Sequence, residues 1–148
     1  MTDDRSTTPL LLTVGEADAA LDQQLSAGLD AHNFAATGHS DLRELTVKVE
    51  DAAGDLVAGL SGWTWATCAG IGMVWVRDDS RRDGWGAKLL AAAEDAARAR
   101  GCRQVLVSSF TFQAPEFYRR HGYVEFARSE GIPVPGLADV HFRKLLTS

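Results

Sequence analysis

The feature that most constrains the fold is a glycine-containing turn between an apolar run and a long helix-forming stretch. The run at 71–76 has the β-branched and aromatic bias of a buried strand, and polar residues 77–80 follow it. A stretch rich in Ala and Leu then continues from Gly86 to Arg100, where Gly101 is placed to end a helix. The predicted order is therefore strand, polar loop, glycine turn and helix.

The turn itself reads Arg81-Arg82-Asp83-Gly84-Trp85-Gly86. A helix N-terminus has unpaired backbone N–H groups and about half a positive charge, so it binds phosphate groups well. Glycine lets an anion approach these amides, and the two arginines can add charge-assisted hydrogen bonds. A plain turn with solvated arginines is the alternative, but the position between a strand and a helix favours an anion site. A dinucleotide fingerprint is disfavoured because its third glycine would fall at Leu89.

The remaining sequence predicts one domain over residues 9–148, after a flexible tail at residues 1–8. Apolar residues spaced by four between 16 and 34 predict a helix or helix pair with a break near Gly28. Alternation over 44–50, turn residues at 51–55 and an apolar run at 56–60 predict a hairpin. Further strands are predicted at 10–14, 105–107, 123–126 and around 140–142, and a short helix at 115–120.

Composition narrows the function. The net charge of -5 and the lack of a Lys or Arg run disfavour nucleic acid as a partner. A signal peptide and an apolar run near the roughly 20 residues of a membrane span are missing, so we expect a cytoplasmic protein without a membrane partner. Cys68 and Cys102 lack metal-ligand spacing, which predicts two buried thiols and no metal.

Two blocks of sequence resemble the GNAT superfamily of acyl-CoA N-acetyltransferases. The first runs from Met73 through the glycine turn to Leu90. The second is 110–123, in which Ala114 precedes an aromatic-Tyr pair and a Gly-aromatic pair ends the helix. The resemblance implies an α+β, three-layer fold with a central mixed, mostly antiparallel sheet flanked by helices. It also implies acetyl-CoA as cosubstrate and acetyl transfer to a small amine or peptide amine, by direct attack in a ternary complex.

Carried over to this sequence, the resemblance implies roles for particular residues. Tyr118 would be the general acid that protonates the leaving thiolate, although it can also be a packing residue, and Tyr123 is the rival phenol. Thr111 stands where many members have Asn, and the stretch 63–76 has no acidic residue to act as the base that some members place there. The residues implied to contact the coenzyme are Val74, Trp75, Val76, Arg81, Arg82, Asp83, Gly84, Trp85, Gly86, Ala87 and Lys88.

The acceptor site is less constrained. Trp63 and Trp65 are two residues apart on a predicted strand and would wall a pocket from the same side, while Asn33 and Phe34 are weaker candidates. Exposed strand edges near the C-terminus are compatible with a homodimer. A non-catalytic acyl-CoA-binding or sensing module and a nucleotide-binding domain stay open as alternatives. The candidate bases or substrate contacts, none singled out by spacing, are His32, His39, Asp41, Glu44, Glu125 and His141.

Overall fold

The structure is a computed structural model that describes residues 8–147, and the chain divides after Gly38 into two compact units. The predicted tail lies outside the described residues except for Thr8, which is exposed and has no regular structure. The predicted strand at 10–14 is wrong, because these residues are exposed and pair with no other strand in the described part of the chain. A run of apolar residues forms a strand only where a partner satisfies its backbone groups.

In the first unit, the described residues 8–38 contain one helix, α1 (Ala19–Thr37). The Asp18 side chain accepts a hydrogen bond from the Leu21 amide at 2.9 Å and caps the N-terminus, and Gly38 ends the helix with φ +74°. The helix continues through Gly28, so the predicted break there is wrong. A glycine inside a helix costs about 0.5–1 kcal/mol relative to alanine, which the helix-forming neighbours and the two caps outweigh.

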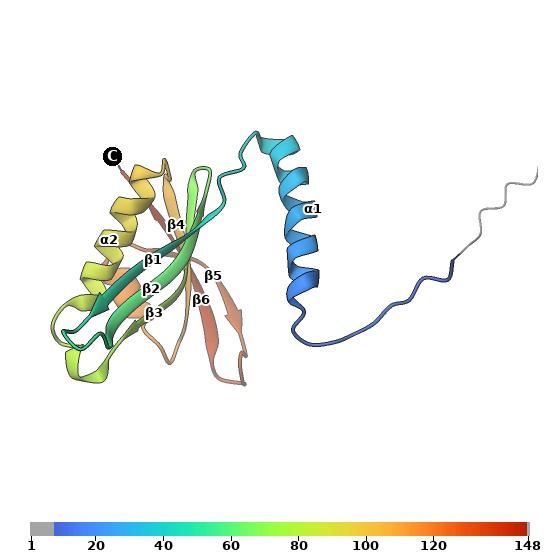
Figure 1. The fold of residues 1–148 in the computed structure, drawn as a ribbon. Coiled ribbons are helices and arrows are strands. Elements are labelled where there is room, and N and C mark those ends of the chain that lie inside the picture. Colours follow the sequence, from blue (N-terminus) through green and yellow to red (C-terminus); the bar gives the residue numbers. More distant parts are fainter. Residues whose placement is uncertain (1–7, 148) are drawn as a thin grey trace, which may run out of the picture. The chain divides into compact units, whose positions relative to one another are not determined.

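The described residues of the second unit form a six-stranded sheet in the order β1-β2-β3-β4-β6-β5 (Figure 1). All neighbouring strands are antiparallel except β3 and β4, which are parallel. This confirms the predicted α+β fold with a mixed, mostly antiparallel sheet. The strands are β1 (Arg43–Glu50), β2 (Leu56–Trp65), β3 (Cys68–Val76), β4 (Gln104–Phe110), β5 (Val124–Glu130) and β6 (Ala138–Leu145).

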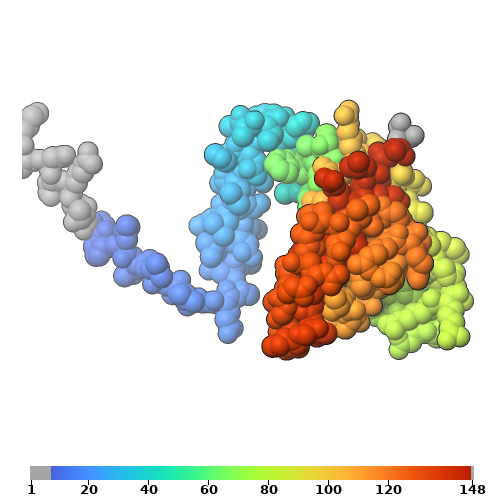
Figure 2. Space-filling model, turned by 180° about the vertical axis from the view of Figure 1, so that it is seen from behind, coloured from blue at the N-terminus to red at the C-terminus, as the bar shows by residue number. Residues whose placement is uncertain are grey.

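Two helices pack on this sheet. The longer one, α2 (Trp85–Ala99), confirms the helix predicted between Gly86 and Arg100; it lies across β1–β3 and buries Leu89, Leu90 and Ala93 in the core. The shorter one, α3 (Pro115–Arg120), has the predicted bounds, and it forms one continuous surface with β5 and β6 (Figure 2, orange to red). Among residues 8–147, every helix is too short or too polar to span a membrane.

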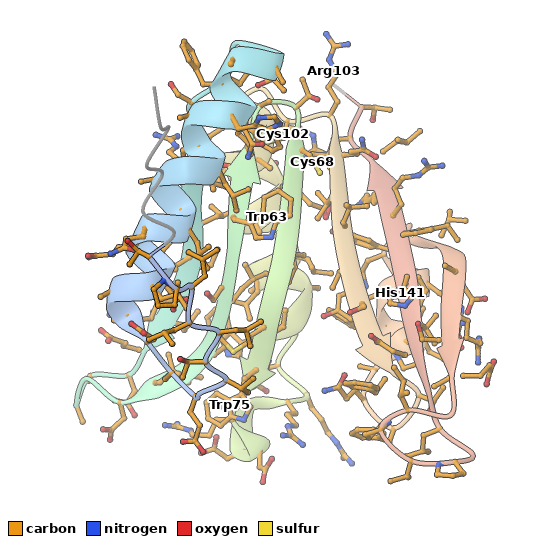
Figure 3. All side chains as sticks on the ribbon, turned by 90° about the vertical axis from the view of Figure 1, so that its right-hand side faces the viewer. Trp63, Cys68, Trp75, Cys102, Arg103 and His141 are labelled. Carbon is orange, nitrogen blue, oxygen red and sulfur yellow. The ribbon has the colours of Figure 1, made fainter. Side chains whose placement is uncertain are left out.

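The parallel pairing of β3 and β4 is short. Within the described residues it comprises three residue pairs and ends at Gly70 and Leu106. Beyond this point β3 pairs with β2 alone and β4 pairs with β6 alone. Figure 3 shows the two strands diverging from the end that carries Cys68 toward the end that carries Trp75. The sheet is therefore split into two halves, β1-β2-β3 and β4-β6-β5, with a gap between them.

Candidate functional site

A groove of about 920 Å³ opens where the two halves of the sheet separate. Its walls come from the diverging strands, from the turn before α2 and from α3. No strand pairs with 71–76 on the side that faces β4, so the amides and carbonyls on that side can bind a ligand, apart from the Val76 carbonyl, which accepts from Arg81. The lining residues include Val74, Trp75, Val76, Arg81, Arg82, Gly84, Gly86, Ala87 and Tyr118. Most of the residues predicted to contact a coenzyme thus share one groove.

The turn before α2 presents free backbone amides to this groove. The first helical hydrogen bond runs from the Lys88 amide to the Gly84 carbonyl at 3.1 Å. The amides of Trp85, Gly86 and Ala87 therefore have no acceptor within the helix, and no side chain caps this end. Such an N-terminus is suited to hold a phosphate group.

Positions 84 and 86 of the turn favour glycine for different physical reasons. Gly84 has φ +77°, a left-handed conformation that disfavours a side chain, although an added Cβ would meet nothing within 4 Å. Gly86 has an ordinary backbone conformation, but an added Cβ would lie 3.1 Å from the ring of Phe117. Gly86 therefore also allows α2 to pack closely against α3, a role that the sequence did not suggest.

The polar loop between β3 and α2 is braced by Arg77, which the sequence analysis did not single out. Its Nε donates to Asp79 Oδ1 at 2.7 Å, and its Nη1 donates to Asp51 Oδ2 at 3.2 Å in the β1–β2 turn. The pKa of the Asp51 carboxyl is lowered by the backbone amide of Asp55 and then by Arg77, while Arg77 lowers the pKa of the Asp79 carboxyl. The loop is thereby fixed to the neighbouring hairpin.

Arg81 and Arg82 differ in their partners. Arg81 Nε donates to the Val76 carbonyl at 3.0 Å, and its Nη2 lies 2.9 Å from Asp78 Oδ1. The Arg81 guanidinium therefore links the loop between β3 and α2 to the end of β3. Arg82 is exposed and forms no hydrogen bond or ion pair in the part of the chain that the structure describes, so its guanidinium is free to meet an anion at the groove.

Tyr118 lines the groove and is only 7% exposed. Its ring packs against Phe117, Tyr123 and Phe142, but its hydroxyl has no hydrogen-bond partner among residues 8–147. Burial raises the pKa of Tyr118 above its ordinary value, so the phenol keeps its proton at neutral pH. Tyr118 is therefore a protonated phenol in the wall of the groove.

Tyr123, the rival phenol, is in the core. It is 2% exposed, and its hydroxyl donates to Glu94 Oε2 at 3.5 Å, while Lys144 Nζ lies 2.5 Å from Glu94 Oε1. Burial, and after it the charge of Glu94, raises the pKa of Tyr123. This phenol serves a buried polar cluster of helix α2 and strand β6.

Three side chains form hydrogen bonds that fix the loop before α3. The Ser109 hydroxyl, buried in the sheet, accepts from the Ala114 amide at 3.1 Å, and Gln113 Oε1 accepts from the Phe110 amide at 2.9 Å. Thr111 Oγ1 accepts from the Ala138 amide at 3.2 Å and ties the loop to β6. Thr111 thus stabilises the loop. Ser109 fixes the start of α3, and the sequence pattern did not predict this.

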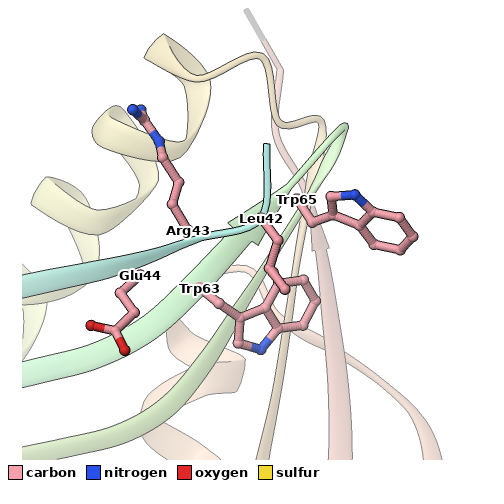
Figure 4. A pocket seen from close by; sticks show the side chains of 5 residues that line it. All are labelled: Leu42, Arg43, Glu44, Trp63 and Trp65. Carbon is pink, nitrogen blue, oxygen red and sulfur yellow. The ribbon is translucent and has the colours of Figure 1, made fainter. Parts of the chain in front are cut away.

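Trp63 and Trp65 line a second cavity of about 570 Å³ with Leu42, Arg43 and Glu44 (Figure 4). Asn33 and Phe34 lie on α1 in the first unit, so the structure does not test their assignment to an acceptor site. Among the six candidate bases, Glu44 alone lines either cavity. The others are His32 on α1, His39 and Asp41 before β1, Glu125 beside Arg128, and His141, whose Nε2 lies 3.0 Å from Ser129 Oγ.

The thiols differ from the expectation in one respect. Cys102 is buried, but Cys68 is only partly buried, because it stands at the start of β3 near the end of the sheet (Figure 3). Burial raises the pKa of both thiols, which disfavours a nucleophilic thiolate at either position.

Comparison with known proteins gives consistent matches. The profile of the acetyltransferase (GNAT) domain matches residues 43–125. An acetyltransferase of Agrobacterium fabrum is 31% identical over 109 residues, which cover 74% of this chain and 80% of that protein. Blasticidin-S acetyltransferase of Streptomyces morookaense is 40% identical over 74 residues, which cover 47% of this chain and only 52% of that relative. The crystal structure of an acetyltransferase from Agrobacterium tumefaciens superposes with a TM-score of 0.84 at 26% identity, covering 93% of this chain and 100% of that one.

Proposed function

This chain belongs to the GNAT acetyltransferases, and from that premise we propose that it moves an acetyl group from acetyl-CoA to a primary amine by direct attack in a ternary complex. The observation that carries the proposal is the groove between β3 and β4, which brings free backbone amides, an unpaired arginine and a protonated phenol together.

The groove suits acetyl-CoA in two ways. The free amides of 85–87, with Arg82, match the negative charges of the pyrophosphate. On the side that faces β4, the backbone of 74–76, apart from the Val76 carbonyl that Arg81 occupies, matches the amide groups of the pantetheine arm, which can hydrogen-bond to it as a neighbouring strand would. The coenzyme then lies between the two halves of the sheet.

The chemistry follows from this placement. The neutral amine attacks the thioester carbonyl carbon, the N–C bond forms, and the C–S bond breaks with its electrons on sulfur. Tyr118 donates its proton to that thiolate and is reprotonated from solvent. The amine loses its proton to water, since 63–76 contains no carboxylate. Direct transfer is favoured over an acyl-enzyme because burial keeps Cys68 and Cys102 protonated.

The test is release of CoA from acetyl-CoA, with formation of the acetylated product, across a panel of primary amines. The panel includes lysine, peptide N-termini, polyamines and blasticidin S, because a relative is named for the last of these. Thermal stabilisation by acetyl-CoA without release by any amine would show an acyl-CoA-binding or sensing module instead. Stabilisation by ATP or NAD but not by acetyl-CoA would show a nucleotide-binding domain.

A further inference from the structure

We infer that the cavity beside Trp63 binds a positively charged group of the acceptor, so that the substrates are primary amines that carry a second, cationic group. The inference rests on the proposed function and names its substrate class. Its basis is the side-chain chemistry around Glu44, a residue to which the transfer reaction itself assigns no role.

Glu44 and Trp63 lie on the face of the sheet opposite α2. They are register partners on β1 and β2, so their side chains point the same way. Their neighbours Leu45 and Thr64 point to the other face, where both are buried, and Thr64 Oγ1 accepts a hydrogen bond from Arg100 beyond the end of α2 at 3.0 Å. The cavity is thus on the side of the sheet that α2 leaves uncovered.

This cavity adjoins the inner end of the groove. Trp63 stacks over Gly70, because a Cβ added there would lie 2.3 Å from the indole Cε2. Gly70 is also the last residue of β3 that pairs with β4, and the groove lining begins with Ile71. An acceptor held against Trp63 therefore reaches the gap between β3 and β4 from the face of the sheet opposite α2. The turn before α2 borders the same groove at the other end of β3.

The cavity has a negative charge that no side chain neutralises. The Glu44 carboxylate forms no hydrogen bond or ion pair with any of residues 8–147, whereas Glu50 on the same strand is paired with Lys48 at 3.0 Å. Arg43 contributes to the rim but extends to the opposite side of β1 from Leu42 and Glu44 (Figure 4).

The aromatic wall is fixed in place. The indole Nε1 of Trp65 donates to the His39 carbonyl at 3.4 Å, and Asp41 Oδ1 accepts from the Ala66 amide at 3.1 Å at the tip of the β2–β3 turn. A carboxylate that lines a cavity together with two indole rings attracts a cation, through the ion pair and through the negative ring faces. Because Arg43 extends away from Glu44, the carboxylate side of the cavity favours a cation over an anion.

The experiment compares three primary amines that differ in their distal group. These are (5-aminopentyl)trimethylammonium, its uncharged carbon isostere 6,6-dimethylheptylamine, and the anionic 6-aminohexanoate. We expect kcat/KM with acetyl-CoA to be about 5- to 10-fold higher for the cation than for the isostere, and lowest for the anion. Glu44→Gln should reduce the preference to about 2-fold or less. Glu50→Gln removes the same charge from the same strand outside the cavity, so it should leave the preference unchanged.

A binding titration separates this inference from the proposed function. Tryptophan fluorescence reports binding of each amine, and we expect the cation to bind the wild type more tightly than Glu44→Gln even without turnover. Equal kcat/KM for the cation and the isostere in the wild type, or a preference that Glu44→Gln retains, would overturn the inference while the transferase stands. Selective cation binding without CoA release from any amine would overturn the proposed function and support the inference about the cavity.

Discussion

Replacing Tyr118 by phenylalanine separates a proton donor from a packing residue. The substitution keeps the ring that packs against Phe117 and Phe142, and it removes a hydroxyl that has no hydrogen-bond partner among the described residues. No internal hydrogen bond is lost, so the free energy of unfolding should change by less than about 0.5 kcal/mol. If the phenol protonates the leaving thiolate, kcat should fall by about 10² to 10⁴ fold at saturating acetyl-CoA.

Tyr123→Phe is the matched control, five positions along the chain. It removes the hydroxyl that donates to Glu94, so it should lower the free energy of unfolding by about 1 kcal/mol and leave kcat nearly unchanged. CoA release is followed with a thiol reagent, and stability by thermal unfolding. A Tyr118→Phe enzyme with wild-type kcat, under conditions where chemistry limits the rate, would refute the role of Tyr118 as the acid.

Three further outcomes are expected. Gly86→Ala should lower stability by about 1 kcal/mol, because its Cβ meets Phe117, and the same substitution should cost less in a Phe117→Leu background, as thermal unfolding of the four proteins of the double-mutant cycle would show. Arg82→Ala should weaken acetyl-CoA binding in calorimetry by about 1 kcal/mol, and by less at high salt; an unchanged affinity would exclude contact with the pyrophosphate. Burial raises the pKa of Tyr118 and Tyr123, so the unfolded chain loses these protons first. The stability that these two protonated phenols contribute is therefore complete below about pH 10 and is lost above it. Denaturant unfolding between about pH 8 and pH 11 should show the free energy of unfolding falling, and the fall should be smaller in Tyr123→Phe.

The sequence predicted well the parts of the fold that local patterns determine. The alternation around Leu45 and the caps of α2 and α3 are properties of short stretches, and the strands and helices they predicted are present. The strand at 10–14 and the break at Gly28 failed for a common reason. Both were inferred from local preference, whereas a strand needs a pairing partner and a glycine breaks a helix only when its neighbours and caps are weak.

The sequence predicted most of the residues that line the groove, but not the long-range contacts that hold its walls together. The glycine turn predicted an anion site at the N-terminus of α2, and most of the other residues of that prediction line the same groove. The contact of Gly86 with Phe117 and the brace from Arg77 to Asp51 join segments about 26 to 31 positions apart, and no local spacing records such contacts. Glu44 was among six equal candidates until the register with Trp63 set it apart.

The three residue pairs that join β3 to β4 also bear on how this molecule avoids aggregation. An unpaired strand edge on a protein surface is a template on which another chain can add a strand. Here the edges of 71–76 and 107–109, which pair with no strand on this side, face each other inside the molecule, and the N-terminus of α2 and the helix α3 flank the space between them. A long flexible ligand can be threaded between these edges, but a second folded sheet cannot align with them. These inner strand edges are thus accessible to a small ligand but not to the sheet of another copy of the protein.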